Sequence, residues 1–178
     1  MSEATAPPTL LFVDDEPGIL SALRRLFRPH GYRIFIAEGG AAGLEVLEKE
    51  QIDLVISDMR MPEMDGATFL KEVRSRWPNV MRILLTGYAD ITSTVAAINQ
   101  GEIYRYISKP WDDNEIVSIV GEAIEHQNLK RENLRLTSLT QAQNDQLKEL
   151  NASLEQKVAD RTAELRFVLS FVEQTHSE

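Results

Sequence analysis

Short apolar runs alternate with helical patterns along the first two thirds of the chain. The apolar runs have the length and composition of buried strands, and they lie at residues 10–13, 33–37, 54–57, 82–85 and 104–108. Helical spacing of apolar side chains follows each run, at residues 17–30, 40–50, 66–77, 90–100 and from 116 onward. Parallel strands need crossover connections, which helices usually supply. The pattern therefore predicts a parallel α/β sheet with helices on both faces.

After residue 126 the apolar positions narrow to one stripe on a continuous helical pattern. The stripe advances in steps of three and four residues, as the seam of a coiled coil does, with stutters at 139–147 and 150–158. One helix cannot bury so narrow a stripe, so we expect residues 126–175 to form a parallel homodimeric stalk. A lone solvated helix, a disordered segment and an antiparallel hairpin are the alternatives. The stripe consists of Leu129, Glu132, Leu136, Leu139, Gln143, Leu147, Leu150, Leu154, Val158, Arg161, Leu165, Val168 and Val172.

Length, charge and composition narrow the classes of function. The 178 residues suit one ordinary domain with an appendage. Residues 1–125 carry 20 acidic and 12 basic side chains, which argues against a nucleic-acid partner and suits a cation site. The absence of cysteine excludes disulfides and fits a cytoplasmic protein. The composition of residues 1–8 predicts a disordered leader without an export signal. No apolar run is long enough to span a membrane, so we expect no membrane partner.

Polar side chains follow several of the predicted strands at the point where each strand ends. Asp14 and Asp15 follow the first strand, Asp58 the third, Thr86 the fourth and Lys109 the fifth. Taken alone, Asp58 would most simply cap the next helix. In a doubly wound sheet, however, these strand ends converge on one edge. We therefore expect the five side chains to meet there.

Such a set of side chains suits phosphoryl transfer to a carboxylate. Three adjacent carboxylates raise one another's pKa unless a cation neutralises them, and oxygen ligands favour Mg²⁺. An Asp carboxylate can attack phosphorus. A metal ion, a lysine and a hydroxyl group can then neutralise the charge on the phosphoryl oxygens. The sequence thus predicts Asp58 as the nucleophile, with Lys109 and Thr86 stabilising the transferred group.

An ordered set of residues on this alternating pattern resembles the receiver domain of two-component response regulators over residues 9–125. The resemblance implies a flavodoxin-like (βα)5 doubly wound sheet of strand order 2-1-3-4-5, continued here by a coiled-coil signalling helix at 126–178. It also implies a sensor histidine kinase as phosphoryl donor and a signalling protein rather than an enzyme. The residues that carry the resemblance are Asp14-Asp15, Asp58, Thr86, Tyr106 and Lys109-Pro110.

The resemblance implies a role for each residue of the site. Asp58 would be the phosphoacceptor, and Asp15 and Asp58 would bind Mg²⁺ directly. Asp14 would assist through a water molecule, and the backbone carbonyl of Arg60 would complete the protein ligands. Lys109 would contact the phosphoryl group. The peptide bond that follows Lys109 is expected to be cis, as is usual in the family.

Thr86 and Tyr106 resemble the family's switch pair. Phosphate on Asp58 would draw the Thr86 hydroxyl inward and leave space into which Tyr106 rotates. The surface formed by the fourth helix, the fifth strand and the fifth helix would change as a result, because a bistable element can be biased by a local charge. An ordinary aromatic side chain at the edge of the core is the alternative for Tyr106.

Two further stretches narrow the resemblance. Residues 87–90, 97–101 and 103–111 look like receivers joined to HD-GYP cyclic-di-GMP phosphodiesterases or to hydrogenase-type transcriptional regulators. Residues 154–165 are similar to a signalling-helix linker found ahead of many output domains. We therefore expect the chain to lack its output domain. A cyclic-di-GMP phosphodiesterase would fit as that output domain.

Two other classes of function stay open. An aspartate-nucleophile phosphohydrolase would use the same carboxylate, but it usually has an acidic residue where this chain has Arg60. A coiled-coil assembly module would keep the fold without signalling. The sequence identifies neither the cognate kinase nor the effect of phosphorylation on the dimer.

Overall fold

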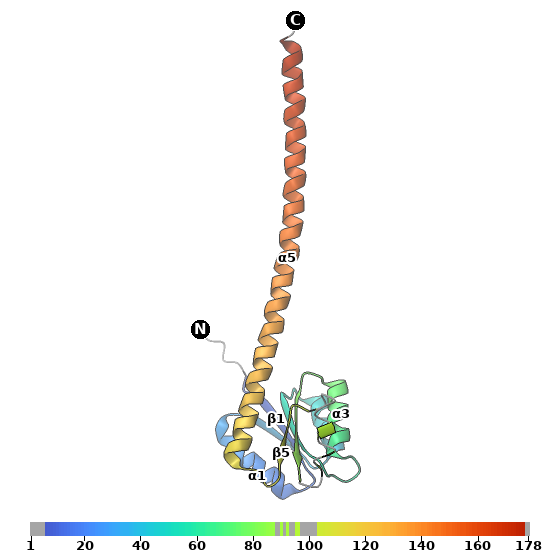
Figure 1. Cartoon of the computed structure of the whole chain (residues 1–178), viewed down its shortest axis with the longest axis vertical. Helices are drawn as coiled ribbons and strands as arrows, with labels where there is room; N and C mark the ends of the chain where they lie inside the picture. The colour runs from blue at the N-terminus through green and yellow to red at the C-terminus, as the bar shows by residue number, and fades with distance from the viewer. Residues whose placement is uncertain (1–5, 88–89, 91, 93–94, 97–102, 177–178) are drawn as a thin grey trace. The chain divides into compact units, whose positions relative to one another are not determined.

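The computed structural model describes residues 6–87, 90, 92, 95–96 and 103–176. Its core is a five-stranded sheet with helices on both faces (Figure 1). Neighbouring strands are parallel in the order β2-β1-β3-β4-β5, which confirms the predicted doubly wound sheet. The elements are β1 (Thr9–Val13), α1 (Pro17–Phe27), a 3-10 turn (Arg28–His30), β2 (Arg33–Ala37), α2 (Gly40–Lys49), β3 (Leu54–Asp58), α3 (Gly66–Arg76), β4 (Met81–Thr86), β5 (Arg105–Ser108) and α5 (Asp113–Thr175).

Alternate residues of each central strand build two apolar layers. Leu10 and Phe12 of β1 pack with α1 and the first turns of α5, and Leu11 and Val13 pack with α2 and α3. Successive side chains of a strand point to opposite faces, so one strand can serve both layers. β1 and β3 are buried over their whole length. The two strands that lead to Asp14 and Asp58 are therefore packed on both faces.

Two central strands end later than the sequence pattern predicts. β3 extends to Asp58 and β4 to Thr86, because the parallel register pairs Asp58 with Leu85 and Thr86 with Ser108. The backbone of each residue is thus fixed by the sheet rather than by a loop. The predicted helix at 90–100 falls largely outside the described residues, as does most of the predicted leader.

Inter-residue contacts divide the chain into two units, residues 1–129 and residues 130–178. The helix α5 enters the second unit without interruption, and every described residue from Lys130 to His176 is exposed. The predicted stripe is exposed there together with apolar residues that lie off it, namely Leu134, Phe167, Leu169 and Phe171. Among the described residues, no helix has the length and apolar character needed to span a membrane.

Candidate functional site

Three carboxylates gather at the carboxyl edge of the sheet. Asp14 follows β1 directly, Asp15 is its neighbour, and Asp58 is the last residue of β3. One oxygen from each lies within 4.8 Å of the others. Asp14 is fully buried and Asp58 is 7% exposed. The adjacency of β1 and β3 in the sheet is what brings these carboxylates together.

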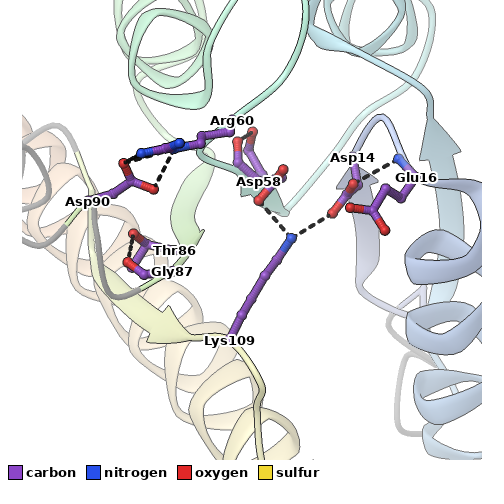
Figure 2. Close-up of polar contacts among 9 residues, drawn as sticks. Asp14, Glu16, Asp58, Arg60, Thr86, Gly87, Asp90 and Lys109 are labelled. Carbon is purple, nitrogen blue, oxygen red and sulfur yellow. Dashed lines mark hydrogen bonds and ion pairs between the residues drawn. The ribbon is translucent and has the colours of Figure 1, made fainter.

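Lys109 reaches this cluster from the fifth strand (Figure 2). Its Nζ lies 2.7 Å from Asp58 Oδ1 and 3.2 Å from Asp14 Oδ2. The Lys109 backbone N–H donates to the Thr86 carbonyl at 2.8 Å, so the end of β4 positions this residue. The peptide bond from Lys109 to Pro110 is cis, as the resemblance implies.

The electrostatics of the cluster leave negative charge in excess. Burial raises the pKa of the Asp14 carboxyl, and the nearby Asp58 raises it further, against an opposing hydrogen bond from the Glu16 N–H at 2.9 Å. Burial lowers the pKa of Lys109, but hydrogen bonding and charge interactions with Asp58 and Asp14 outweigh it and raise the pKa overall. One ammonium group contacts two of the three carboxylates, and the oxygen-only donor set fits a hard divalent cation such as Mg²⁺.

The loop after Asp58 is held close beneath the site. Met59 N–H donates to the Leu85 carbonyl at 2.9 Å, and Gly66 N–H donates to the Met59 carbonyl at 2.8 Å. A Cβ at Gly66 would collide with the backbone carbonyl oxygen of Asp58, so only glycine allows this approach. Gly66 was not among the predicted site residues, although the Asp-Gly pair that opens α3 is a signal for a close turn.

Thr86 and Tyr106 lie on neighbouring strands and point to the same face of the sheet. The register pairs Tyr106 with Leu84, two residues before Thr86. Thr86 is buried, and its hydroxyl donates to the Gly87 carbonyl at 3.1 Å. Tyr106 is 38% exposed. The two residues thus share one face of neighbouring strands, as the predicted coupling requires, and the coupling itself stays a prediction.

Arg60 has a partner that the sequence analysis missed. Its guanidinium makes a bidentate pair with Asp90, with Nε 3.1 Å from both carboxylate oxygens and Nη2 3.0 Å from Oδ1 (Figure 2). This hydrogen bonding raises the pKa of Arg60. Because the two residues are 30 positions apart, no local motif indicated the contact. The predicted metal-ligand role of the Arg60 carbonyl stays a prediction.

Comparison with known proteins identifies the family. The family model described as "Response regulator receiver domain" matches residues 10–121. The chain is 41% identical over 119 residues to the transcriptional regulatory protein GlrR of Escherichia coli, covering 67% of this chain and 27% of the relative. It is 37% identical over 128 residues to the hydrogenase transcriptional regulatory protein HoxA of Cupriavidus necator, covering 72% and 26%. The chain thus spans about a quarter of the length of these relatives.

A solved structure gives the same result at the level of one domain. The signal receiver domain of an HD domain-containing protein from Pseudomonas fluorescens is 42% identical, with a TM-score of 0.69 over 74% of this chain and 97% of that one. The predicted resemblance to hydrogenase-type regulators is confirmed by HoxA. The strand order, the acidic cluster and these matches lead to one conclusion: the chain belongs to the family of response regulator receiver domains.

Proposed function

We propose that this chain is the phosphoacceptor receiver of a two-component phosphorelay, with Asp58 as the residue that a sensor histidine kinase phosphorylates. The observation that carries the proposal is the 2.7 Å contact between Asp58 and Lys109 inside the cluster of three carboxylates. The carboxylate thus lies beside a cation that can neutralise phosphoryl oxygens, and the site is suited to forming an aspartyl phosphate.

In the proposed step, a carboxylate oxygen of Asp58 attacks phosphorus as the bond from phosphorus to the donor imidazole breaks. Lys109 neutralises charge on the phosphoryl oxygens, since its ammonium already lies between Asp58 and Asp14. The carboxylates of Asp15 and Asp58 would bind Mg²⁺, with Asp14 acting through water. The metal ion would supply further charge neutralisation to the phosphoryl group.

We further propose that phosphorylation changes a dimeric stalk built from residues 126–175. Thr86 and Tyr106 would relay the change from the site to the surface of β5 and α5. The exposed apolar stripe of the second unit supports a partner helix, because a narrow apolar seam on a long helix is stable when paired. The similarity to a receiver from an HD domain-containing protein supports a cyclic-di-GMP phosphodiesterase as the output.

Acetyl phosphate with Mg²⁺ tests the acceptor assignment by intact mass spectrometry. We expect a mass increase of one phosphoryl group in the natural chain and none in Asp58→Asn. Asp145→Asn is the matched control, because it makes the same change on the exposed second unit. Equal labelling of Asp58→Asn would refute the assignment. Continuous hydrolysis of an aryl phosphate would instead support the phosphohydrolase class.

Light scattering with and without beryllofluoride and Mg²⁺ tests the proposed relay. We expect a change in mass or hydrodynamic radius that requires Asp58 and is lost in Thr86→Ala, although Thr86→Ala still binds beryllofluoride. An unchanged oligomeric state and an unchanged radius would support the non-signalling assembly module. The two experiments are independent, so a receiver that is phosphorylated without changing the stalk would be recognised.

A further inference from the structure

The outer edge of the sheet at β2 carries an open strand beside an apolar groove. Arg33 N–H donates to the Pro8 carbonyl at 3.0 Å, and the Ala37 carbonyl accepts from Asp14 N–H at 3.2 Å. Alternate residues of an edge strand direct their backbone groups to opposite sides, so those of Ile34 and Ile36 face away from β1. Among the described residues no strand lies beyond β2. Two backbone donors and two acceptors are therefore available there.

A groove of about 460 Å³ runs between this edge and α2. Its floor is apolar, and includes Phe35 and Ala37 of β2 and Val46 of α2. Ile36 borders it and is 39% exposed, which makes it one of few large apolar side chains exposed on the first unit. Edge strands in soluble proteins are usually protected by charged side chains, proline or a bulge. The middle of β2, residues 34–36, carries neither charge nor proline.

The rim of the groove is acidic. Glu38, Glu45 and Glu50 line it together with the single base Lys49. Glu50 pairs with Arg33 at 3.4 Å, whereas no ion pair within the described residues neutralises Glu38 or Glu45. An occupant with positive side chains would gain from these two carboxylates.

We propose that the β2 edge and the β2–α2 groove bind an extended basic segment of a partner protein, in which every second residue faces the groove and these residues include both apolar side chains and Lys or Arg. The segment would add as a sixth strand, and its backbone would pair with Ile34 and Ile36. Its apolar side chains would cover the groove floor, and its cations would reach Glu38 and Glu45. A second copy of this chain fits less well as the occupant. Pairing of two β2 edges would bring Glu38 and Glu45 of one copy close to the same carboxylates of the other, and like charges repel.

The proposal does not depend on phosphorylation, since the groove residues are separate from the carboxylate cluster. A fluorescent nine-residue peptide with Lys, Val, Val, Val and Lys at its odd positions and Ser at its even positions is the first probe, because its odd side chains all face the groove. The same peptide with Glu in place of Lys is its control. Titrations use the full chain and are followed by anisotropy and by amide chemical shifts. We expect binding of the basic peptide only, with shifts and hydrogen-exchange protection centred on Ile34 and Ile36.

Two double variants decide where the peptide binds. Glu38→Lys/Glu45→Lys is expected to weaken binding roughly tenfold, because it reverses the charge of the rim. Glu72→Lys/Glu125→Lys makes the same change in net charge elsewhere on the first unit and is expected to have little effect. Equal weakening by both, or shifts spread evenly over the acidic surface, would mean non-specific attraction and overturn the proposal.

The variant Ile36→Lys distinguishes binding of a partner segment from pairing with a second copy of this chain. Its side chain is 39% exposed, so the substitution leaves the core intact, which circular dichroism verifies. We expect Ile36→Lys to lose peptide binding while the mass of the peptide-free chain stays unchanged in light scattering. A lower mass of the peptide-free variant would identify a second copy as the occupant. Retained peptide binding would place the peptide elsewhere, and either result overturns the proposal.

Discussion

The two units of the chain use apolar side chains in opposite ways. In residues 6–129 the largest apolar residues are buried against one another, whereas in residues 130–176 every residue is exposed. The first unit therefore contains the contacts that stabilise it. The second unit has helical hydrogen bonds and an apolar stripe, and in our proposal its stabilising contacts come from another helix. Stability in this chain is thus intramolecular in one region and, in our proposal, intermolecular in the other.

The largest expected effect is on the free energy of unfolding, and it is seen by making the same substitution in each unit. Phe69→Ala removes a fully buried ring that packs close to Gly43, and we expect it to lower the free energy of unfolding of the first unit by about 3–5 kcal/mol. Phe171→Ala changes a ring that is 62% exposed and should leave this free energy unchanged. Denaturant unfolding followed by circular dichroism measures both. Similar losses for the two variants would contradict the comparison.

The next effect tests whether the second unit needs a partner. Leu150→Lys with Leu154→Lys places two charges on the predicted seam, where each buried leucine contributes about 1.5–3 kcal/mol. We expect light scattering to report a monomer, with unfolding of the first unit unaffected. Asn151→Lys adds a charge beside the seam and should keep the dimer. A dimer that survives the double substitution would show that the stripe is not the interface.

A smaller loss is expected at Gln127, which belongs to α5 but is 4% exposed. Its side-chain amide donates to the Asp53 carbonyl at 2.9 Å and the Asn79 carbonyl at 2.7 Å, at the starts of β3 and β4. Gln127→Ala should lower the free energy of unfolding by about 1–3 kcal/mol, because the Asn79 carbonyl loses its bond inside the protein. Asn128→Ala, at the exposed neighbouring position, is the control. If the two variants lower the free energy of unfolding equally, the loss comes from helix propensity rather than from the buried hydrogen bonds.

The smallest effect concerns the pH dependence of Asp14. Its pKa is raised above the ordinary 3.8 by burial, so the folded state binds its proton more tightly than the unfolded state does. This carboxyl therefore costs stability as the pH rises from 3.8 through its folded-state pKa. Asp14→Asn should melt at a higher temperature than the natural chain at neutral pH without divalent cation, and the difference should shrink toward acid pH.

Thermal scans from about pH 4 to about pH 8 measure this difference. The gain is limited because the substitution also weakens the 3.2 Å contact with Lys109. Asp145→Asn, which is exposed, should show no such trend. A destabilised Asp14→Asn at neutral pH would mean that the contact with Lys109 outweighs the cost of burial.

Most of the fold was predictable because it follows from periodic burial. β2 begins and ends where the pattern placed it, β1, β3 and β5 differ by one residue at one end, and β4 differs by one residue at each end. The strand ends that carry Asp14, Asp58 and Lys109 were predictable for the same reason, since parallel strands end at a common edge. The structure brings these side chains within contact distance.

The unpredicted contacts join residues that are far apart in sequence. Arg60 meets Asp90, and Gln127 meets backbone carbonyls more than 40 residues away. The acidic groove at β2 likewise depends on how α2 packs beside the edge strand. Local propensity has no information on such pairs, because the partners are chosen by packing.

The sequence by itself determined the order of strands and helices, the family and the stripe on the long helix, since each depends on local spacing or on residue identity. Only the tertiary structure decided that Lys109 bridges Asp58 and Asp14 and that Gly66 lies against the Asp58 carbonyl. It also decided that no strand of the described part of the chain covers the edge of β2. These features depend on distances of a few ångströms between separate segments, and such distances are set only when the whole sheet has packed.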